Sequence, residues 1–179
     1  MSVVRVNQIQ DTSTNVAANI SGGVVTFTNP PVGAGKVLQV KQLLVDKSTI
    51  TTSSATFVST GKSFSITPSA TSSKIMVEIR GGEAHCPYVS QFMVSTIFRG
   101  SINAPYPGSN VLGIQTIGNS SSGLSVSTHN ICFLDSPNTT NEVTYTPHFR
   151  SQPTKPDCYF NLAGSDGSAF TITLTEIGG

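Results

Sequence analysis

The fold is decided by residues 123–151, GLSVSTHNICFLDSPNTTNEVTYTPHFRS, in which two runs of alternating polar and apolar residues flank one polar loop. Successive side chains of a strand point to opposite faces, so each run predicts a strand with one half-buried face. In the second run Val143, Tyr145 and Phe149 share a face. The loop, residues 135–141, is built from Asp, Ser, Pro, Asn and Thr, which favour turns. We therefore expect a long hairpin, covered on its apolar face by a second layer from the rest of the chain.

Composition places the chain among neutral, strand-rich proteins. Its 179 residues are enough for one domain with a core and a small terminal arm. Only 11% of the residues are charged and the net charge is +1, so we expect neither nucleic acid nor a membrane surface as a partner. No apolar run approaches the roughly 18 residues that a membrane span needs. The N-terminus carries a charge and several amides where a signal peptide has an apolar core, so export by that route is not expected.

Cysteine usage argues against a disulfide framework. The three cysteines, Cys86, Cys132 and Cys158, are odd in number and widely spaced. Cys132 and Cys158 lie within apolar strand patterns, where a free cysteine behaves as a small hydrophobic residue. We therefore expect both of these side chains to be buried.

From residue 36 onward, strand-like runs alternate with Gly, Pro and Ser turns. Residues 37–45 form a rich β run that we expect to be deeply covered. Residues 74–80 show the clearest inside-outside alternation, and the glycine pair that follows is expected to end this strand. Residues 170–177 show the same alternation at the end of the chain. About nine or ten such strands, without helical periodicity, predict an all-β protein, an antiparallel β-sandwich of jelly-roll-like form.

The chain is expected to divide into residues 1–35, an N-terminal arm and linker, and residues 36–179, the β-sandwich head. The arm offers two short strand-like runs, at residues 3–6 and 24–28, separated by a polar stretch of small residues. A segment rich in Pro and Gly then marks the boundary. Since the arm has too few large apolar residues to fold by itself, it is either mobile or docked on another body.

No pattern of residues marks an active site or a metal site. His129 and His148 lie on the same face of the two arms of the expected hairpin, where a cross-strand pair would suit a metal or a pH-sensitive contact. No carboxylate or third histidine has the spacing to complete a metal site, so we favour two half-exposed strand residues. The sequence has no Gly-x-Ser-x-Gly elbow and no phosphate-binding loop, and no pair stands out among its nine acidic residues. We therefore expect no enzyme, no catalytic residues, no metal and no cofactor.

Two loops carry aromatic residues that the sequence predicts to be exposed. One presents His85 and Tyr88, and the other presents Asn103 and Tyr106, whose ring lies between two prolines. A rigid tyrosine loses little entropy on binding and offers both an apolar face and a hydroxyl, which suits carbohydrate or protein recognition. These four residues are the candidate receptor or glycan contacts. The alternative for Tyr106 is that its ring folds back to plug the end of the sandwich.

Several segments resemble small structural proteins of marine tailed bacteriophages, cyanophages in particular, which are tail fibres or other virion structural proteins. The resemblance is carried by KVLQVK at residues 36–41, SITPSATSSKIMV at 65–77, FLDSPN at 133–138 and ITLTEI at 172–177. The opening VRVNQIQDTS, residues 4–13, is similar to the N-termini of phage fibre proteins, which attach to the virion. These motifs are structural and bring no catalytic residues with them.

The resemblance implies a non-enzymatic protein located in the virion, a homotrimeric fibre-like component that joins another virion protein through residues 1–35. Val4, Val6 and Ile9 are the implied anchoring residues. The sandwich would then face outward, towards a host-surface glycan.

Two alternatives stay open on the sequence. Because the chain has no long shaft region, a capsid decoration protein is also consistent with it. From another class, a carbohydrate-binding, lectin-like module that uses Tyr88 and Tyr106 also fits. A small hydrolase would need a carboxylate pair that the sequence does not mark.

Overall fold

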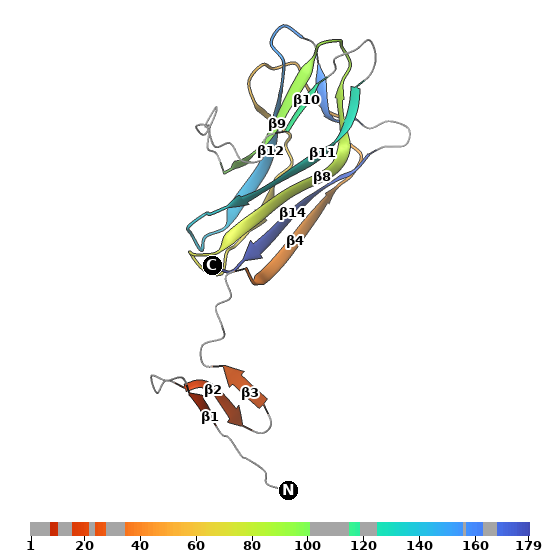
Figure 1. Cartoon of the computed structure of the whole chain (residues 1–179). Helices are drawn as coiled ribbons and strands as arrows, with labels where there is room; N and C mark the ends of the chain where they lie inside the picture. Colours follow the sequence, from red (N-terminus) through yellow and green to blue (C-terminus); the bar gives the residue numbers. More distant parts are fainter. Residues whose placement is uncertain are drawn as a thin grey trace.

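The computed structural model describes most of the chain, namely residues 8–10, 16–21, 24–27, 35–100, 115–118, 125–155, 157–162 and 168–179. Within these ranges the chain forms β-strands joined by turns and irregular segments, and contains no helix. The strands of residues 35–179 form two antiparallel sheets that pack face to face (Figure 1). The predicted all-β sandwich class is therefore confirmed.

A separate antiparallel sheet lies at the N-terminus, formed by β1 (Gln8–Gln10), β2 (Val16–Ser21) and β3 (Val24–Phe27) (Figure 1). Its strands pair only with one another among the described residues. β3 matches the expected run at residues 24–28, whereas β2 lies in the polar stretch of small residues, where the sequence analysis predicts no strand. In β2, Val16, Ala18 and Ile20 alternate with the small residues Ala17, Asn19 and Ser21, a short period-2 pattern of low hydrophobicity. The expected run at residues 3–6 lies outside the described residues.

The two sheets of the sandwich are built from strands that are distant in sequence. One sheet has the order β10 (Gln115–Gly118), β9 (Phe92–Arg99), β12 (Val143–Ser151) and β6 (Val58–Ser59), with β7 (Phe64–Ile66) also paired to β12. The other has the order β4 (Val37–Val45), β14 (Phe170–Ile177), β8 (Lys74–Cys86), β13 (Cys158–Asn161) and β5 (Ile50–Thr52), with β11 (Ser125–Asp135) also paired to β8.

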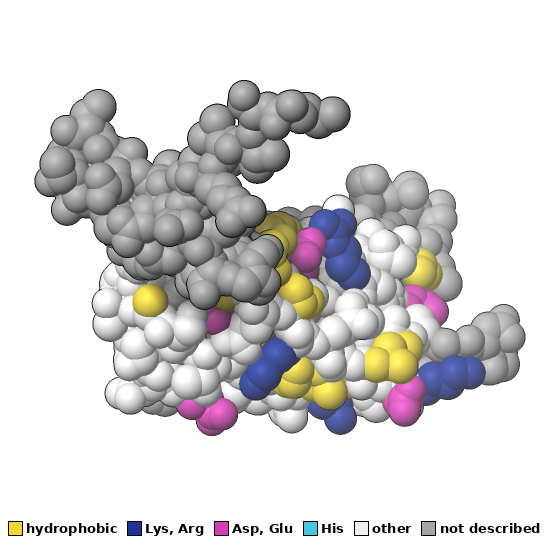
Figure 2. Space-filling view, turned by 90° about the horizontal axis from the view of Figure 1, so that it is seen from below, with side chains coloured by type: hydrophobic (Ala, Val, Ile, Leu, Met, Phe, Trp, Pro, Cys, Tyr) yellow, Lys and Arg dark blue, Asp and Glu magenta, His cyan; other side chains and the backbone are white. Residues whose placement is uncertain are grey.

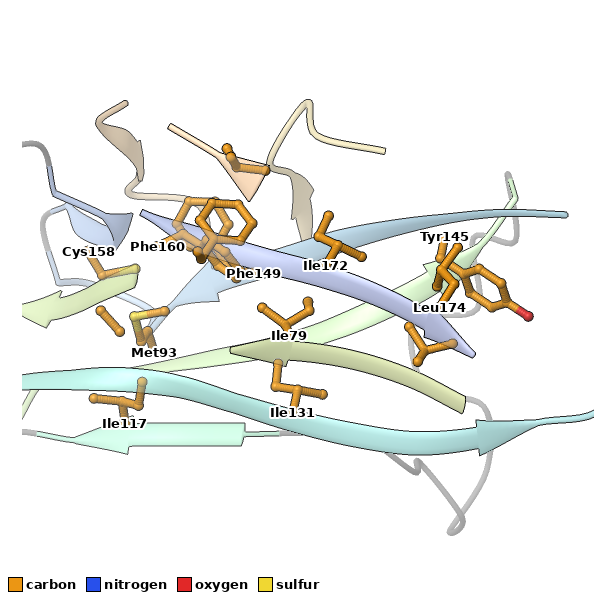
Figure 3. Close-up of a cluster of buried hydrophobic side chains, with 14 of the residues drawn as sticks. Ile79, Met93, Ile117, Ile131, Tyr145, Phe149, Cys158, Phe160, Ile172 and Leu174 are labelled. Carbon is orange, nitrogen blue, oxygen red and sulfur yellow. The ribbon is translucent and has the colours of Figure 1, made fainter. Parts of the chain in front are cut away.

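The core lies between the sheets, where the inward-facing positions of each strand meet (Figure 3). Ile75, Val77 and Ile79 of β8 face Tyr145 and Phe149 of β12, and all five side chains are fully buried. Burying a large apolar side chain of this kind contributes about 1.5–3 kcal/mol, so these alternating positions dominate the stability of the sandwich. The inside-outside alternation expected for residues 74–80 and 170–177 is confirmed by the burial of every second residue.

The predicted hairpin of residues 123–151 is wrong. β11 pairs with β8 over the length of the strand, whereas β12 pairs with β9, β7 and β6 in the opposite sheet. The loop between β11 and β12 therefore crosses from one sheet to the other. Alternation indicates that one face of a strand is buried, as it is for β12, but it does not specify the neighbouring strand. The nearest strand in sequence is a common partner and not a required one.

Two other strand predictions need correction. Within the part of the chain that the structure describes, β4 is an edge strand that pairs only with β14, and most of its side chains are exposed, so residues 37–45 are not deeply covered. β8 continues to Cys86 and does not end at the glycine pair. Gly81 and Gly82 have φ values of 88° and 70°, and a Cβ on Gly81 would lie 2.8 Å from the carbonyl oxygen of Ala169. The glycines thus form a bulge inside the strand, where β8 passes close to the start of β14.

The cysteine prediction is right at one position and wrong at another. Cys158 is fully buried, as expected, and Cys86 is buried with it. Cys132 is exposed because its side chain lies on the outer face of β11, while its neighbour Ile131 faces the core. The error arises because apolar residues occur on both faces of this strand.

Candidate functional site

The turn between β8 and β9, residues 87–91, is held rigidly at one end of the sandwich. Gln91 is buried beneath it, and its Oε1 accepts a hydrogen bond from the backbone N–H of Tyr88 at 3.2 Å. Its Nε2 donates to Ser151 Oγ and to the carbonyl oxygen of Asp157, both at 3.3 Å. The amide of Gln91 therefore fixes the turn to the ends of β12 and to the segment that precedes β13.

The turn presents two exposed apolar side chains beside one cation. Tyr88 is 50% exposed and Val89 is 47% exposed. Lys155, on the loop that follows β12, donates a hydrogen bond to the carbonyl oxygen of Val89 at 3.4 Å. We call Tyr88, Val89 and Lys155 the tip surface. An aromatic ring with a hydroxyl, next to an ammonium group and held by a rigid backbone, is suited to contact with a glycan or a protein.

His85 belongs to the support of this surface and not to its exposed part, which corrects our placement of this residue in an exposed loop. Because β8 continues past the glycine bulge, His85 pairs with Tyr159 of β13 and is only 7% exposed. The two rings stack with centroids 5.2 Å apart and an interplanar angle of 21°. Burial lowers the pKa of His85, and the charge of Glu83 opposes that shift.

Most of the remaining candidate contact and anchoring residues lie outside the described residues. Asn103 and Tyr106 lie outside the described residues, as do Val4 and Val6. Ile9 lies in β1. The roles assigned to these residues stay predictions.

The two histidines of the supposed hairpin are not neighbours, because β11 and β12 belong to different sheets. His129 is buried on β11, with Nε2 2.7 Å from the carbonyl oxygen of Phe160 and the two rings stacked at 3.8 Å. His148 is half-buried on β12, where its ring meets Phe98 edge-on. The expectation of two half-exposed residues is therefore wrong for His129. Among the described residues, His, Cys, Asp and Glu side chains form no group of three or more that could hold a metal ion.

The tip surface and the start of the sandwich lie at opposite ends. Gly35 and Lys36 hydrogen-bond to Gly178, with N–O distances of 3.0 and 2.8 Å, so the first residues of the sandwich lie beside its C-terminus. β8 begins at that end, where Lys74 pairs with Ile177, and its 13 residues lead to the tip surface. At about 3.3 Å per residue, the strand separates the two ends by roughly 40 Å. The mark C in Figure 1 shows this end of the sandwich.

Charge is sparse on the surface as well as in the sequence. Figure 2 shows the molecule from below, where hydrophobic patches are interspersed among uncharged surface with few Lys, Arg, Asp or Glu side chains. No described residue belongs to a helix with the length and hydropathy needed to cross a bilayer.

Comparison with known proteins gives weak likenesses only. No protein-family model matches the chain, and no curated protein matches it. Among solved structures, one of infectious bursal disease virus strain Gx is 12% identical and covers 90% of this chain and 36% of that chain, with a TM-score of 0.41. A mutant VP2 protein of infectious bursal disease virus, in derived T=1 particles, is 6% identical and covers 88% of this chain and 43% of that chain, with a TM-score of 0.40. A structure of strain Gt is 8% identical and covers 90% of this chain and 46% of that chain, with a TM-score of 0.35. The chain thus spans less than half of the length of each of these viral chains.

Proposed function

We propose that this protein is a non-enzymatic structural component of a tailed-phage virion, a homotrimeric fibre-like protein attached through residues 1–35. The resemblance of its strand segments to virion proteins supports this proposal. The observation that carries it is the position of two features at opposite ends of the sandwich. Gly35, where the sandwich begins, lies at one end, and the exposed ring of Tyr88 lies at the other. Such a molecule, anchored at one end, presents a rigid aromatic contact at the other.

The anchoring role is tested with particles assembled from the full chain and from a chain that lacks residues 1–34. We expect the truncated chain to fold, with an unchanged strand signal in circular dichroism, and to be missing from purified particles. Normal incorporation of the truncated chain would contradict the assignment. Replacement of Val4 and Val6 by Asp in the full chain is the matched test, because it keeps the length of the arm.

A fibre and a capsid decoration protein differ in what happens to particles that lack them. Without a fibre, particles remain intact on heating and fail to adsorb to host cells. Without a decoration protein, particles adsorb but break at a lower temperature. Both measurements on the same preparation decide between the two roles.

The tip surface favours a glycan on the host as the contact, and it also supports the second candidate, a lectin-like module. A glycan array probed with the purified full chain tests both. We expect binding that is lost in Tyr88→Ala and kept in Val126→Ala, a change at a similarly exposed apolar residue on β11. The absence of binding to any glycan would contradict a glycan contact at Tyr88.

A further inference from the structure

The outer face of the sheet formed by β4, β14, β8 and β11 carries a row in which three apolar residues, Val40, Met76 and Leu134, are interrupted only by Thr175, which is 7% exposed. Val40 pairs with Thr175, Thr175 pairs with Met76, and Met76 pairs with Leu134, so the four side chains cross the sheet in register. Val40 is 59% exposed and Leu134 is 44% exposed. Soluble sheets that face water on one side normally place polar side chains there, so this row is out of place on a free surface.

Neighbouring positions extend the row into a larger surface. Leu44 lies two positions beyond Gln42 on the same side of β4 and is 60% exposed, and Leu38 lies two positions before Val40. Cys132 lies two residues before Leu134 on β11 and is also exposed. We call these residues the outer apolar face: Leu38, Val40, Leu44, Met76, Cys132 and Leu134.

This side of β8 carries one ion pair and one further cation. Arg80 forms an ion pair with Glu78 at 2.9 Å and also donates to Asn130, so the middle of the sheet carries one matched pair. Lys74, at the end of β8, is the further charged residue of that strand on this side. Because the middle of the sheet has no net charge, a strongly charged partner would find little complementary charge there, and copies of this chain could meet there with little repulsion.

The face is also large enough for a specific contact. Four strands spaced about 4.8 Å apart, over a length of nine residues at about 3.4 Å each, give roughly 600 Å² per copy. The three faces of the proposed homotrimer, each turned to a common axis, would together bury roughly 1,800 Å², which exceeds the lower limit of about 1,200 Å² for stable protein–protein interfaces. In addition, β14 is the one strand that pairs with β4 among the described residues, and natural proteins tend to cover a long apolar edge strand of this kind.

We propose that the outer apolar face packs against the same face of the other copies of this chain in the homotrimer, around a common axis. This assignment deepens the proposed self-association and rests on it, since it names the surface at which copies meet. The core of the contact is the row from Val40 to Leu134, and the free edge of β4 lies at its margin. The tip surface stays outside the contact, because it belongs to the end of the sandwich and not to this sheet face.

Light scattering on the purified full chain tests the assignment. We expect the wild type to have a multiple of the monomer mass of 18.7 kDa at micromolar concentration, and the double variant Val40→Lys with Leu44→Lys to have the monomer mass. Val89→Lys is the matched control, because it places the same charge at another exposed valine, on the tip, and should leave the mass unchanged. A folded double variant that keeps the wild-type mass would overturn the assignment while leaving self-association intact. A monomeric wild type would overturn both.

The thiol of Cys132 gives a second readout that needs no substitution. Cys86 and Cys158 are buried, and burial raises their pKa values to about 11 and about 12, so both are poor nucleophiles. The rate of maleimide labelling should therefore report on Cys132. We expect this thiol to react slowly in concentrated protein and faster on dilution. A labelling rate that does not change on dilution overturns the assignment. If that rate then rises when residues 1–34 are removed, the arm of the same chain covers the face. If the lysine variant does not fold, the milder double variant Val40→Thr with Leu134→Thr replaces it, and its maleimide labelling rate is measured in the same way.

Discussion

The carboxylate of Glu176 accepts hydrogen bonds from both the backbone N–H and the hydroxyl of Ser69, at 2.7 and 2.6 Å. Gln39 donates a third at 2.6 Å, and the side chain is fully buried. Burial opposes ionisation, but these hydrogen bonds outweigh it and lower the pKa of Glu176 to about 2 from its usual 4.5. One buried anion thus ties β14 to the edge strand β4 and to the turn that precedes β8.

We predict that Glu176 makes the fold sensitive to acid. Its folded pKa lies below the unfolded value, so its stabilisation is present above about pH 4.5 and is lost as the pH falls towards 2. The shift corresponds to about 3 kcal/mol at neutral pH. Denaturant unfolding between pH 7 and pH 3 should show this loss in the wild type and not in Glu176→Gln, which is already weakened at pH 7. Glu142→Gln, at an exposed position, is the control, and an equal acid dependence in Glu176→Gln would contradict the prediction.

A second pH effect should come from His129 and lie at higher pH. Burial lowers its pKa to about 4 from 6.5, although the hydrogen bond to Phe160 opposes that shift. The unfolded chain therefore binds a proton below pH 6.5 that the folded chain does not, and stability falls between pH 6.5 and pH 4. We expect the unfolding free energy to drop by about 2 kcal/mol from pH 7 to pH 5, and His129→Phe to remove most of that drop. His85 and His148 shift in the same direction, so a smaller dependence should remain. An unchanged drop in His129→Phe would exclude this residue as the cause.

The glycine bulge of β8 predicts a difference between two alanine substitutions. Gly81 and Gly61 both have positive φ, at 88° and 71°, but a Cβ on Gly81 meets the carbonyl of Ala169 at 2.8 Å, whereas none lies within 4 Å at Gly61. Gly61→Ala should cost about 1 kcal/mol from backbone strain alone. Gly81→Ala should cost 1–3 kcal/mol more, because the strand must also move away from β14. Urea unfolding midpoints, compared at an unchanged m-value, measure the loss of stability in both variants. Equal losses would show that β8 moves away from Ala169 without cost.

How much of this fold is readable from the sequence depends on whether a feature is local. The inner faces of β8, β12 and β14 follow from period-2 alternation, and positions such as Val77 and Phe149 are buried as the pattern indicates. The partner of each strand is a long-range property, so β11 was assigned to β12 when it pairs with β8. A local breaker such as Gly81 has the same sequence signature in a turn and in a bulge. That ambiguity is why His85 was expected in an exposed loop.

The sequence predicts the candidate site, like the fold, only in its local features. The exposure of Tyr88 follows from its place between two strand patterns, but its rigidity depends on Gln91, which is linked to Ser151 and Asp157 by contacts distant in sequence. The outer apolar face was missed because an apolar run such as Val37–Val45 has the same composition whether its cover comes from the same chain or from another. Two polar residues interrupt that run and could have indicated its inner face. Gln39 and Lys41 donate hydrogen bonds to backbone carbonyls at Thr67 and Ser65, at the edge of the opposite sheet.

The crossing from β11 to β12 predicts coupling between Tyr145 and Asp135. The hydroxyl of Tyr145 donates to Asp135 Oδ2 at 2.7 Å, and Arg99 Nη1 contacts both carboxylate oxygens at 3.0 and 2.9 Å. Burial, followed by the hydrogen bond and charge of Asp135, raises the pKa of Tyr145, so the hydroxyl is protonated and donates at neutral pH. Tyr145→Phe should lower the unfolding free energy by about 1–2 kcal/mol, and Asp135→Asn by a similar amount.

The double variant decides whether the two residues act together. If Asp135 holds the crossing loop through Tyr145, the losses in Tyr145→Phe and Asp135→Asn are not additive, and a double-mutant cycle yields a coupling of about 0.5–1.5 kcal/mol. Tyr159→Phe removes a hydroxyl from the other sheet and, combined with Asp135→Asn, should give additive losses. Additive losses in the Tyr145 cycle would mean that the carboxylate is held by Arg99 alone. In that case the ion pair of Arg99, at the end of β9, holds the start of the crossing loop without help from Tyr145.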